Sequence, residues 1–232
     1  MSRPTIRFEA PFFVRDSGED DSVIISGKPP DLVETDLRNG IARFGGQWRH
    51  PDYLQAYIKA ADLLINQALK TKSLDDLGLP IFYLQRHTME LLLKRLLCWF
   101  IELAENKKQI AEKHEKHPTN GEIRRFKNSH ELLELWNDLV NLSSYFGHGN
   151  PPKEIKLFVD QTRHFEKSNT WSRYAISRSK TRSIRHTDNE IELPVVRLQN
   201  CLVDAVKIAV SKNGFDDTYE CKVYNDWCFY RA

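Results

Sequence analysis

The chain has 232 residues, 41% hydrophobic and 28% charged, which is enough for one sizeable hydrophobic core and excludes a largely disordered protein. Its 34 basic and 32 acidic side chains leave a net charge of only +2, so overall charge favours no class of partner.

Residues 1–48 are expected to form an N-terminal extension of mixed structure, outside the helical core. Apolar and polar residues alternate around Ile6 and Phe8, which is typical of a short strand. A second short apolar run is followed by a turn at residues 27–30. The pattern predicts a β-hairpin in this extension and no helix.

Residues 49–214 carry the spacing of amphipathic helices and should hold the core. Apolar side chains recur there at steps of three and four residues, the period of a helix that packs on one side. Gly78 and Pro80 separate the first two helices, and Gly214 follows the last. The pattern predicts helices over residues 51–71, 80–113, 128–142, 151–167 and 194–212.

The fold class expected from these segments is mainly α. The helices should pack in one bundle of about five, because each has an apolar face that must be buried against another. Residues 215–232 are rich in aromatic side chains and cysteine. We expect them to form a C-terminal tail, either a strand or a segment docked on the bundle.

Two charged side chains fall on the apolar face of the second predicted helix. On a helical wheel, Arg86 and Glu90 lie within the stripe of leucines, and His87 lies at its edge. A lone buried charge is costly, so Arg86 and Glu90, which are four residues apart, should pair with each other. The pair either fixes helix register or lines a polar cleft and orients a catalytic or phosphate-binding group.

An arginine and a histidine near the start of the third predicted helix are residue types suited to metal-free RNA cleavage. If this helix begins at Asn128 or Ser129, with Glu131 completing a capping pattern, His130 lies in its first turn. The positive end of the helix dipole attracts phosphate and disfavours a charged imidazole. His130 could then take the proton of a 2′-hydroxyl while Arg125 stabilises charge on the phosphate. The alternative is a histidine that only hydrogen-bonds at the helix start.

A basic stretch before Asp188 is a candidate nucleic-acid-binding segment. Two aromatic residues, Trp171 and Tyr174, accompany its cations. Cations neutralise backbone phosphates and aromatic rings stack on bases, so the combination suits a single strand. The alternative is a solvated loop or a lid. The predicted nucleic-acid-binding residues are Arg173, Arg178, Lys180 and Arg182.

Targeting signals and metal-binding patterns are not evident. No run of about 18 apolar residues occurs, and charged residues interrupt residues 1–15. Cys98, Cys201, Cys221 and Cys228 have neither metal-finger nor redox spacing. We therefore expect a cytoplasmic protein with no membrane segment, no metal and no cofactor.

Three segments resemble the HEPN-like family of helical proteins. The run YLQRHTMELLLKRLL, residues 83–97, resembles a bacterial group with a pattern near Arg-His-x-x-Glu-Leu-x-Leu-Lys. The run RRFKNSHELLELW, residues 124–136, resembles the Arg-x(4–6)-His signature of HEPN ribonucleases. The run HFEKSNTWSRYAISRSK, residues 164–180, resembles a segment near Phe-Arg-Tyr-Pro of the same group. The resemblance covers roughly residues 53–212.

The resemblance implies a helical bundle that is often a homodimer, with two Arg/His pairs facing each other. It also implies a metal-independent endoribonuclease acting on RNA, of the kind found in phage-defence and toxin–antitoxin systems. Carried over, Arg125 binds phosphate and His130 is the base or acid. Arg86 and Glu90 would support this site, with His87 at its edge.

Two positions depart from the family pattern. Phe126 follows the arginine where many active members have asparagine or another polar residue, and Ala175 stands where proline is expected. Some HEPN proteins are inactive and serve as binding modules. The alternative function is therefore a non-catalytic HEPN-like module that dimerises or binds a protein encoded by a neighbouring gene.

Overall fold

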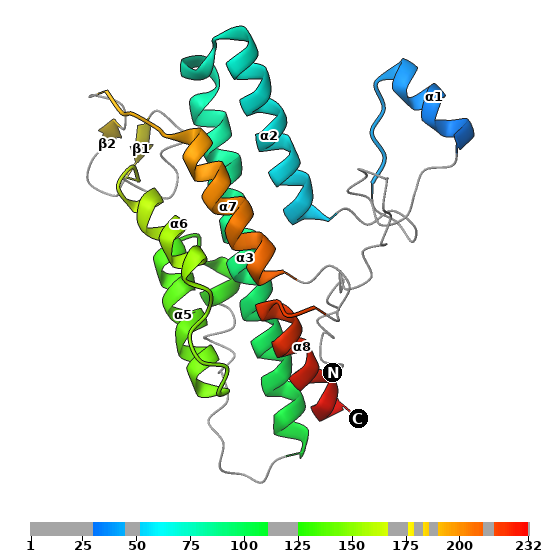
Figure 1. Ribbon diagram of the computed structural model, residues 1–232, viewed down its shortest axis with the longest axis vertical. Coiled ribbons are helices and arrows are strands. Elements are labelled where there is room, and N and C mark those ends of the chain that lie inside the picture. The colour runs from blue at the N-terminus through cyan, green and yellow to red at the C-terminus, as the bar shows by residue number, and fades with distance from the viewer. Residues whose placement is uncertain are drawn as a thin grey trace.

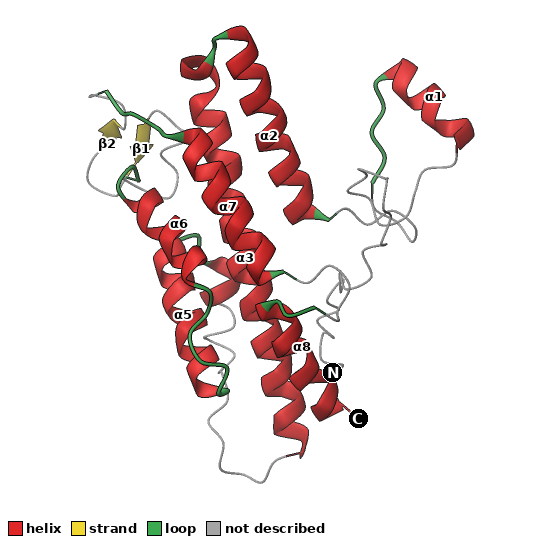
Figure 2. Cartoon of the chain, in the orientation of Figure 1, coloured by secondary structure: helices red, strands yellow, loops and turns green. Residues whose placement is uncertain are grey.

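The computed structural model describes residues 30–44, 52–110, 125–166, 176–178, 183–185, 190–210 and 216–231. Most of these residues are helical (Figure 2), so the expected mainly-α class is confirmed. The elements in chain order are α1 (Pro30–Asn39), α2 (Tyr53–Thr71), α3 (Leu74–Ile110), α5 (Leu132–Tyr145), α6 (Lys153–Arg163), β1 (Ile176–Arg178), β2 (Ser183–Arg185), α7 (Val195–Ala209) and α8 (Tyr219–Arg231).

The long helix α3 forms the centre of the bundle. Helices α2, α5, α6, α7 and α8 all contact it, and Figure 1 shows them arranged along its length. Burying one large apolar side chain contributes roughly 1.5–3 kcal/mol, so this helix contributes much of the stability. Its fully buried side chains include Phe82, Met89, Leu92, Leu93, Leu96 and Phe100.

The start of α3 differs from the prediction. We expected Gly78 and Pro80 to lie in a link, but α3 begins at Leu74 and continues through both. Ile81 is fully buried in a small cluster with residues of α2, and Leu77 packs against that cluster. Pro80 cannot donate a backbone hydrogen bond in the early part of α3, and these apolar contacts outweigh that loss.

The expected absence of helix from residues 1–48 is wrong for the part that the structure describes. Residues 30–39 form α1, which Figure 1 shows set apart from the bundle. Gly40 follows with a φ of 63°, a conformation that glycine adopts without strain, and ends the helix. The hairpin expected near the N-terminus lies outside the described residues.

The C-terminal tail is a helix and not a strand. Helix α8 packs along α3 (Figure 1) and buries Tyr219, Cys221 and Val223. The carboxylate of Glu220 is fully buried and accepts hydrogen bonds from Arg95 at 2.6 and 2.9 Å. The tail therefore docks on the bundle, which is one of the two forms expected from the sequence.

A short hairpin interrupts the helices. Strands β1 and β2 pair antiparallel, with Ser177 opposite Ile184. The sequence predicts no strand here, but Ile176 and Ile184 are β-branched and suit an extended backbone. Among the described residues, no helix is both long and apolar enough to cross a membrane.

Candidate functional site

The segment that carries His130 differs in detail from the prediction. Helix α5 begins at Leu132 with Glu131 as its N-cap residue, not at Asn128 or Ser129. Residues 125–128 form a separate helical turn, and the Ser129 Oγ accepts the Glu131 N–H at 3.2 Å. This bond closes a local turn before the helix, and the N-cap residue Glu131 makes no side-chain capping hydrogen bond, so the expected Asn128–Glu131 capping pattern is absent. His130 consequently lies just before α5 and not in its first turn.

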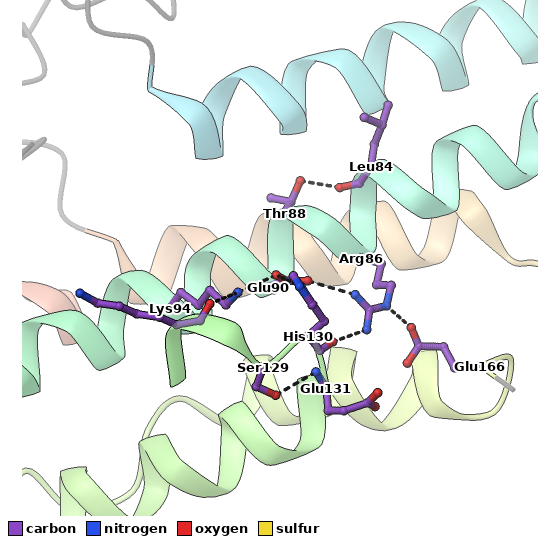
Figure 3. A network of polar contacts seen from close by, with 10 residues as sticks. Leu84, Arg86, Thr88, Glu90, Lys94, Ser129, His130, Glu131 and Glu166 are labelled. Atoms are coloured by element: carbon purple, nitrogen blue, oxygen red, sulfur yellow. Dashed lines mark hydrogen bonds and ion pairs between the residues drawn. The ribbon is translucent and has the colours of Figure 1, made fainter. Parts of the chain in front are cut away.

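Arg86 joins three parts of the chain at this segment (Figure 3). Its Nη1 donates to the Glu90 Oε2 at 3.2 Å, and its Nη2 donates to the backbone carbonyl of His130 at 2.5 Å. Its Nε donates to Glu166, just beyond the end of α6. The guanidinium is only 5% exposed, so the expected burial and pairing of Arg86 with Glu90 are both present.

Glu90 receives hydrogen bonds from three directions. Besides Arg86, its Oε1 lies 2.9 Å from the Lys94 Nζ and 2.8 Å from the His130 Nδ1. Burial alone raises the pKa of Glu90, but the hydrogen bonds and charges of Lys94 and His130 outweigh burial and lower it below 4.5. Glu90 is therefore a carboxylate at neutral pH.

Glu166 has the opposite tendency. Burial raises the pKa of this carboxyl, and the neighbouring guanidinium of Arg86 offsets only part of that effect. The nearby charge of Glu90 also opposes ionisation of Glu166. The two carboxyl groups that share Arg86 thus differ in the ease with which they ionise, and Glu90 holds the negative charge more firmly.

The imidazole of His130 is held on one side and open on the other. Its side chain is 51% exposed, while the carboxylate that meets its Nδ1 is only 6% exposed. A neutral imidazole that donates its Nδ1–H to Glu90 keeps a lone pair on Nε2. A buried carboxylate that fixes the tautomer and orientation of an exposed imidazole is an arrangement suited to proton transfer.

The other predicted site residues lie apart from this network. Arg125 is 55% exposed and pairs with Asp138 of α5, with its guanidinium 5.2 Å from the Phe126 ring. His87 contacts Tyr57 of α2 and stacks on Tyr83, so it faces α2. His87 thus belongs to the packing between α2 and α3, and the structure does not bring it to Glu90.

Most of the predicted nucleic-acid-binding residues lie outside the part of the chain that the structure describes. Arg173, Lys180 and Arg182 lie outside the described residues, and only the backbone of Arg178 is placed, in β1 opposite Ser183.

Two residues of the network were not predicted. Lys94 follows Glu90 by four residues on the same helix, a spacing that could have identified it. Glu166 is 80 positions from Arg86, and no local pattern indicates that contact.

Metal ligands are not clustered in the part of the chain that the structure describes, where no three His, Cys, Asp or Glu side chains could hold an ion. Comparison of the chain with family models, curated proteins and solved structures finds no match. The chemistry open to the site is set by its own residues. These are the fixed imidazole of His130, the ionised carboxylate of Glu90 that contacts it, and two cations, Arg86 and Lys94, that also contact Glu90.

Proposed function

We propose that this chain is a metal-independent endoribonuclease of HEPN type, in which His130 transfers protons. The observation that carries the proposal is the contact of 2.8 Å between the His130 Nδ1 and Glu90, beneath an imidazole that remains half-exposed. An exposed histidine without such a partner would rotate freely. Here Arg86 also holds its backbone carbonyl, so both ends of the residue are fixed.

The proposed reaction uses a nucleophile that RNA itself supplies. The His130 Nε2 takes the proton of a 2′-hydroxyl, and the 2′-oxygen attacks the adjacent phosphorus. The bond from phosphorus to the 5′-oxygen breaks, and that oxygen takes a proton from water or from the imidazolium of a second copy. The products are a 2′,3′-cyclic phosphate and a 5′-hydroxyl. Glu90 stabilises the imidazolium that forms between these steps.

Arg125 is the proposed phosphate ligand. A guanidinium has five N–H donors, so Arg125 can keep its bond to Asp138 and still donate to a phosphate oxygen. Lys127 lies two positions further on in the same exposed turn, and its carbonyl accepts from Lys94 at 3.1 Å. The turn therefore brings two cations to the segment that carries His130.

The wider setting follows from the HEPN resemblance. We propose a cytoplasmic effector of phage defence or a toxin, acting on RNA as a homodimer and regulated by a protein partner. Arg173, Arg178, Lys180 and Arg182 remain the proposed grip on the RNA backbone.

A non-catalytic binding module is the second candidate, and a specific observation favours it. The guanidinium of Arg86 already donates to Glu90, to Glu166 and to the backbone carbonyl of His130. Arg125 is already paired with Asp138. Such closed ion pairs also suit a structural connection between α3, α5 and α6. In this role His130 would have no effect on RNA.

The deciding experiment compares His130→Ala with His164→Ala, a matched change at an exposed histidine just after the end of α6. Cleavage of a labelled single-stranded RNA is followed in the presence of EDTA. Because one positioned proton-transfer group contributes about 10²–10⁴-fold, His130→Ala should lose at least about 100-fold in rate. His164→Ala should cut at the wild-type rate, and circular dichroism should be the same for all three proteins.

Undiminished cleavage by His130→Ala would remove this histidine from the mechanism. No cleavage by the wild-type protein, together with a stable complex with the product of a neighbouring gene, would favour the binding module.

A further inference from the structure

Residues 30–44, which we call the α1 arm, display an unusual amount of apolar surface. Leu37 is 75% exposed and Phe44 is 72% exposed, and Val33 and Ile41 are also exposed. Single exposed apolar residues are normal, but four within fifteen residues make this segment a candidate contact surface.

Hydrogen bonds within the arm give it a defined conformation. The Ile41 N–H donates to the Asp36 carbonyl at 2.8 Å across Gly40, and Arg43 reaches back to the Asp36 carboxylate at 2.7 and 3.0 Å. These bonds fold residues 41–44 against the end of α1. A helix of only ten residues is marginal in water by itself, so burial of its apolar side chains would stabilise it.

An open apolar groove lies elsewhere on the same molecule. It has a volume of about 460 Å³ and lies where the start of α3 meets the start of α7. Leu74, Leu193 and Val196 line it, and Arg197 stands at its side. Val203, two turns further along α7, is also exposed, which extends the apolar face beyond the groove.

We propose that the α1 arm of one copy docks in this groove of a second copy, so that two arms and two grooves join a symmetric dimer. An amphipathic helix laid in an apolar groove is a common mode of recognition. A reciprocal exchange satisfies both surfaces in a closed dimer. The proposal does not depend on the nuclease function.

The placement of the arm favours a second copy over the arm's own groove. Figure 1 shows α1 set apart from the bundle, away from the starts of α3 and α7, where the groove lies. Leu37 and Phe44 stay exposed in this position, so the arm does not fill the groove of its own chain. A second copy offers the same groove to the exposed arm.

Charge also matches between the two surfaces. Glu34 is exposed on α1, and Arg197 is exposed beside the groove. Opposite charges at the rim of an interface set its orientation and suppress wrong pairings. Glu34 and Arg197 therefore provide a pair that can be reversed together in a test.

Sedimentation of the full chain over a range of concentrations tests the proposal. Leu37→Asp and Val196→Asp should each raise the dimer dissociation constant by tenfold or more, since each places a charge in an apolar contact. Leu157→Asp, at a half-exposed leucine of α6, should leave the constant unchanged. Glu34→Arg and Arg197→Glu should each weaken the dimer, and the two changes together should restore it.

Three results would overturn the proposal. The wild-type chain could be monomeric at every concentration, or its dimer could be insensitive to Leu37→Asp and Val196→Asp. The paired reversal of Glu34 and Arg197 could also fail to restore what the single reversals weaken. A loss of thermal stability in a monomer that never associates would show the arm on its own groove.

Discussion

Glu90 is the residue on which the charge balance of the site depends. Its carboxylate contacts Arg86, Lys94 and His130, and its pKa is lowered in the folded chain. A lowered carboxyl pKa stabilises the fold at pH values above the unfolded pKa. That contribution begins to decline as the pH falls below the unfolded value of about 4.5, and it is lost as the pH falls through the lower folded pKa.

Replacing Glu90 by Gln should lower the free energy of unfolding by about 3 kcal/mol at pH 7, because it leaves a buried guanidinium with one carboxylate fewer. Urea denaturation measures the loss, with Glu131→Gln, at an exposed neighbour, as the control. The difference from wild type should shrink as the pH is lowered below 4.5, since protonated Glu90 makes the same contacts poorly. A difference that stayed constant with pH would contradict the assignment.

At this scale the sequence predicted the contacts within one helix better than those between segments. The pairing of Arg86 with Glu90 follows from their four-residue spacing, which is fixed by helix geometry. The contact of Arg86 with Glu166 depends on how α6 ends against α3, which no local pattern encodes. His87, predicted at the edge of the site, packs against Tyr57 of α2, because a residue at the edge of an apolar stripe can face either neighbouring helix.

Among the elements, α8 depends on one buried carboxylate. Glu220 is fully buried and accepts two hydrogen bonds from Arg95 and one, at 2.8 Å, from the Trp99 Nε1. The ring of Trp99 also packs edge-on against Trp227 of α8 at 5.7 Å. The helix is thus attached to α3 by a charge and by aromatic packing at the same place.

Glu220→Gln should release α8 from α3 before the rest of the bundle unfolds. Loss of the charge leaves Arg95 without its partner and should cost about 3 kcal/mol. Tryptophan fluorescence should then show an early step in urea that far-UV circular dichroism registers only in part. Asp217→Asn, at an exposed acid next to α8, should show one transition. A single unchanged transition in Glu220→Gln would contradict this attachment.

The C-terminal end of the chain shows where a sequence pattern fails to predict the type of element. In residues 219–223, apolar Tyr219, Cys221 and Val223 alternate with Glu220 and Lys222, which suits a strand. The segment is nevertheless helical, because Arg95 and Trp99 make burial of Glu220 favourable. In contrast, helices α2 and α7 have regular apolar spacing and were predicted close to their observed bounds.

For the whole molecule, the sequence predicted the class and the helical centre but not the partners of each helix. The buried leucines of α3 define a core from periodicity alone, whereas the order of helices around α3 depends on contacts between distant segments. The HEPN assignment rests on short segments and remains a proposal. What the structure adds is the convergence of Glu90, Arg86 and His130, which the nuclease hypothesis requires.

The most direct test of the central claim is the cleavage of one RNA oligonucleotide and its fully 2′-O-methylated counterpart by the full chain in EDTA. If His130 removes a 2′-proton, only the unmodified RNA should be cut, and its 5′ fragment should end in a 2′,3′-cyclic phosphate. Equal cleavage of both strands, or of neither, would contradict the account.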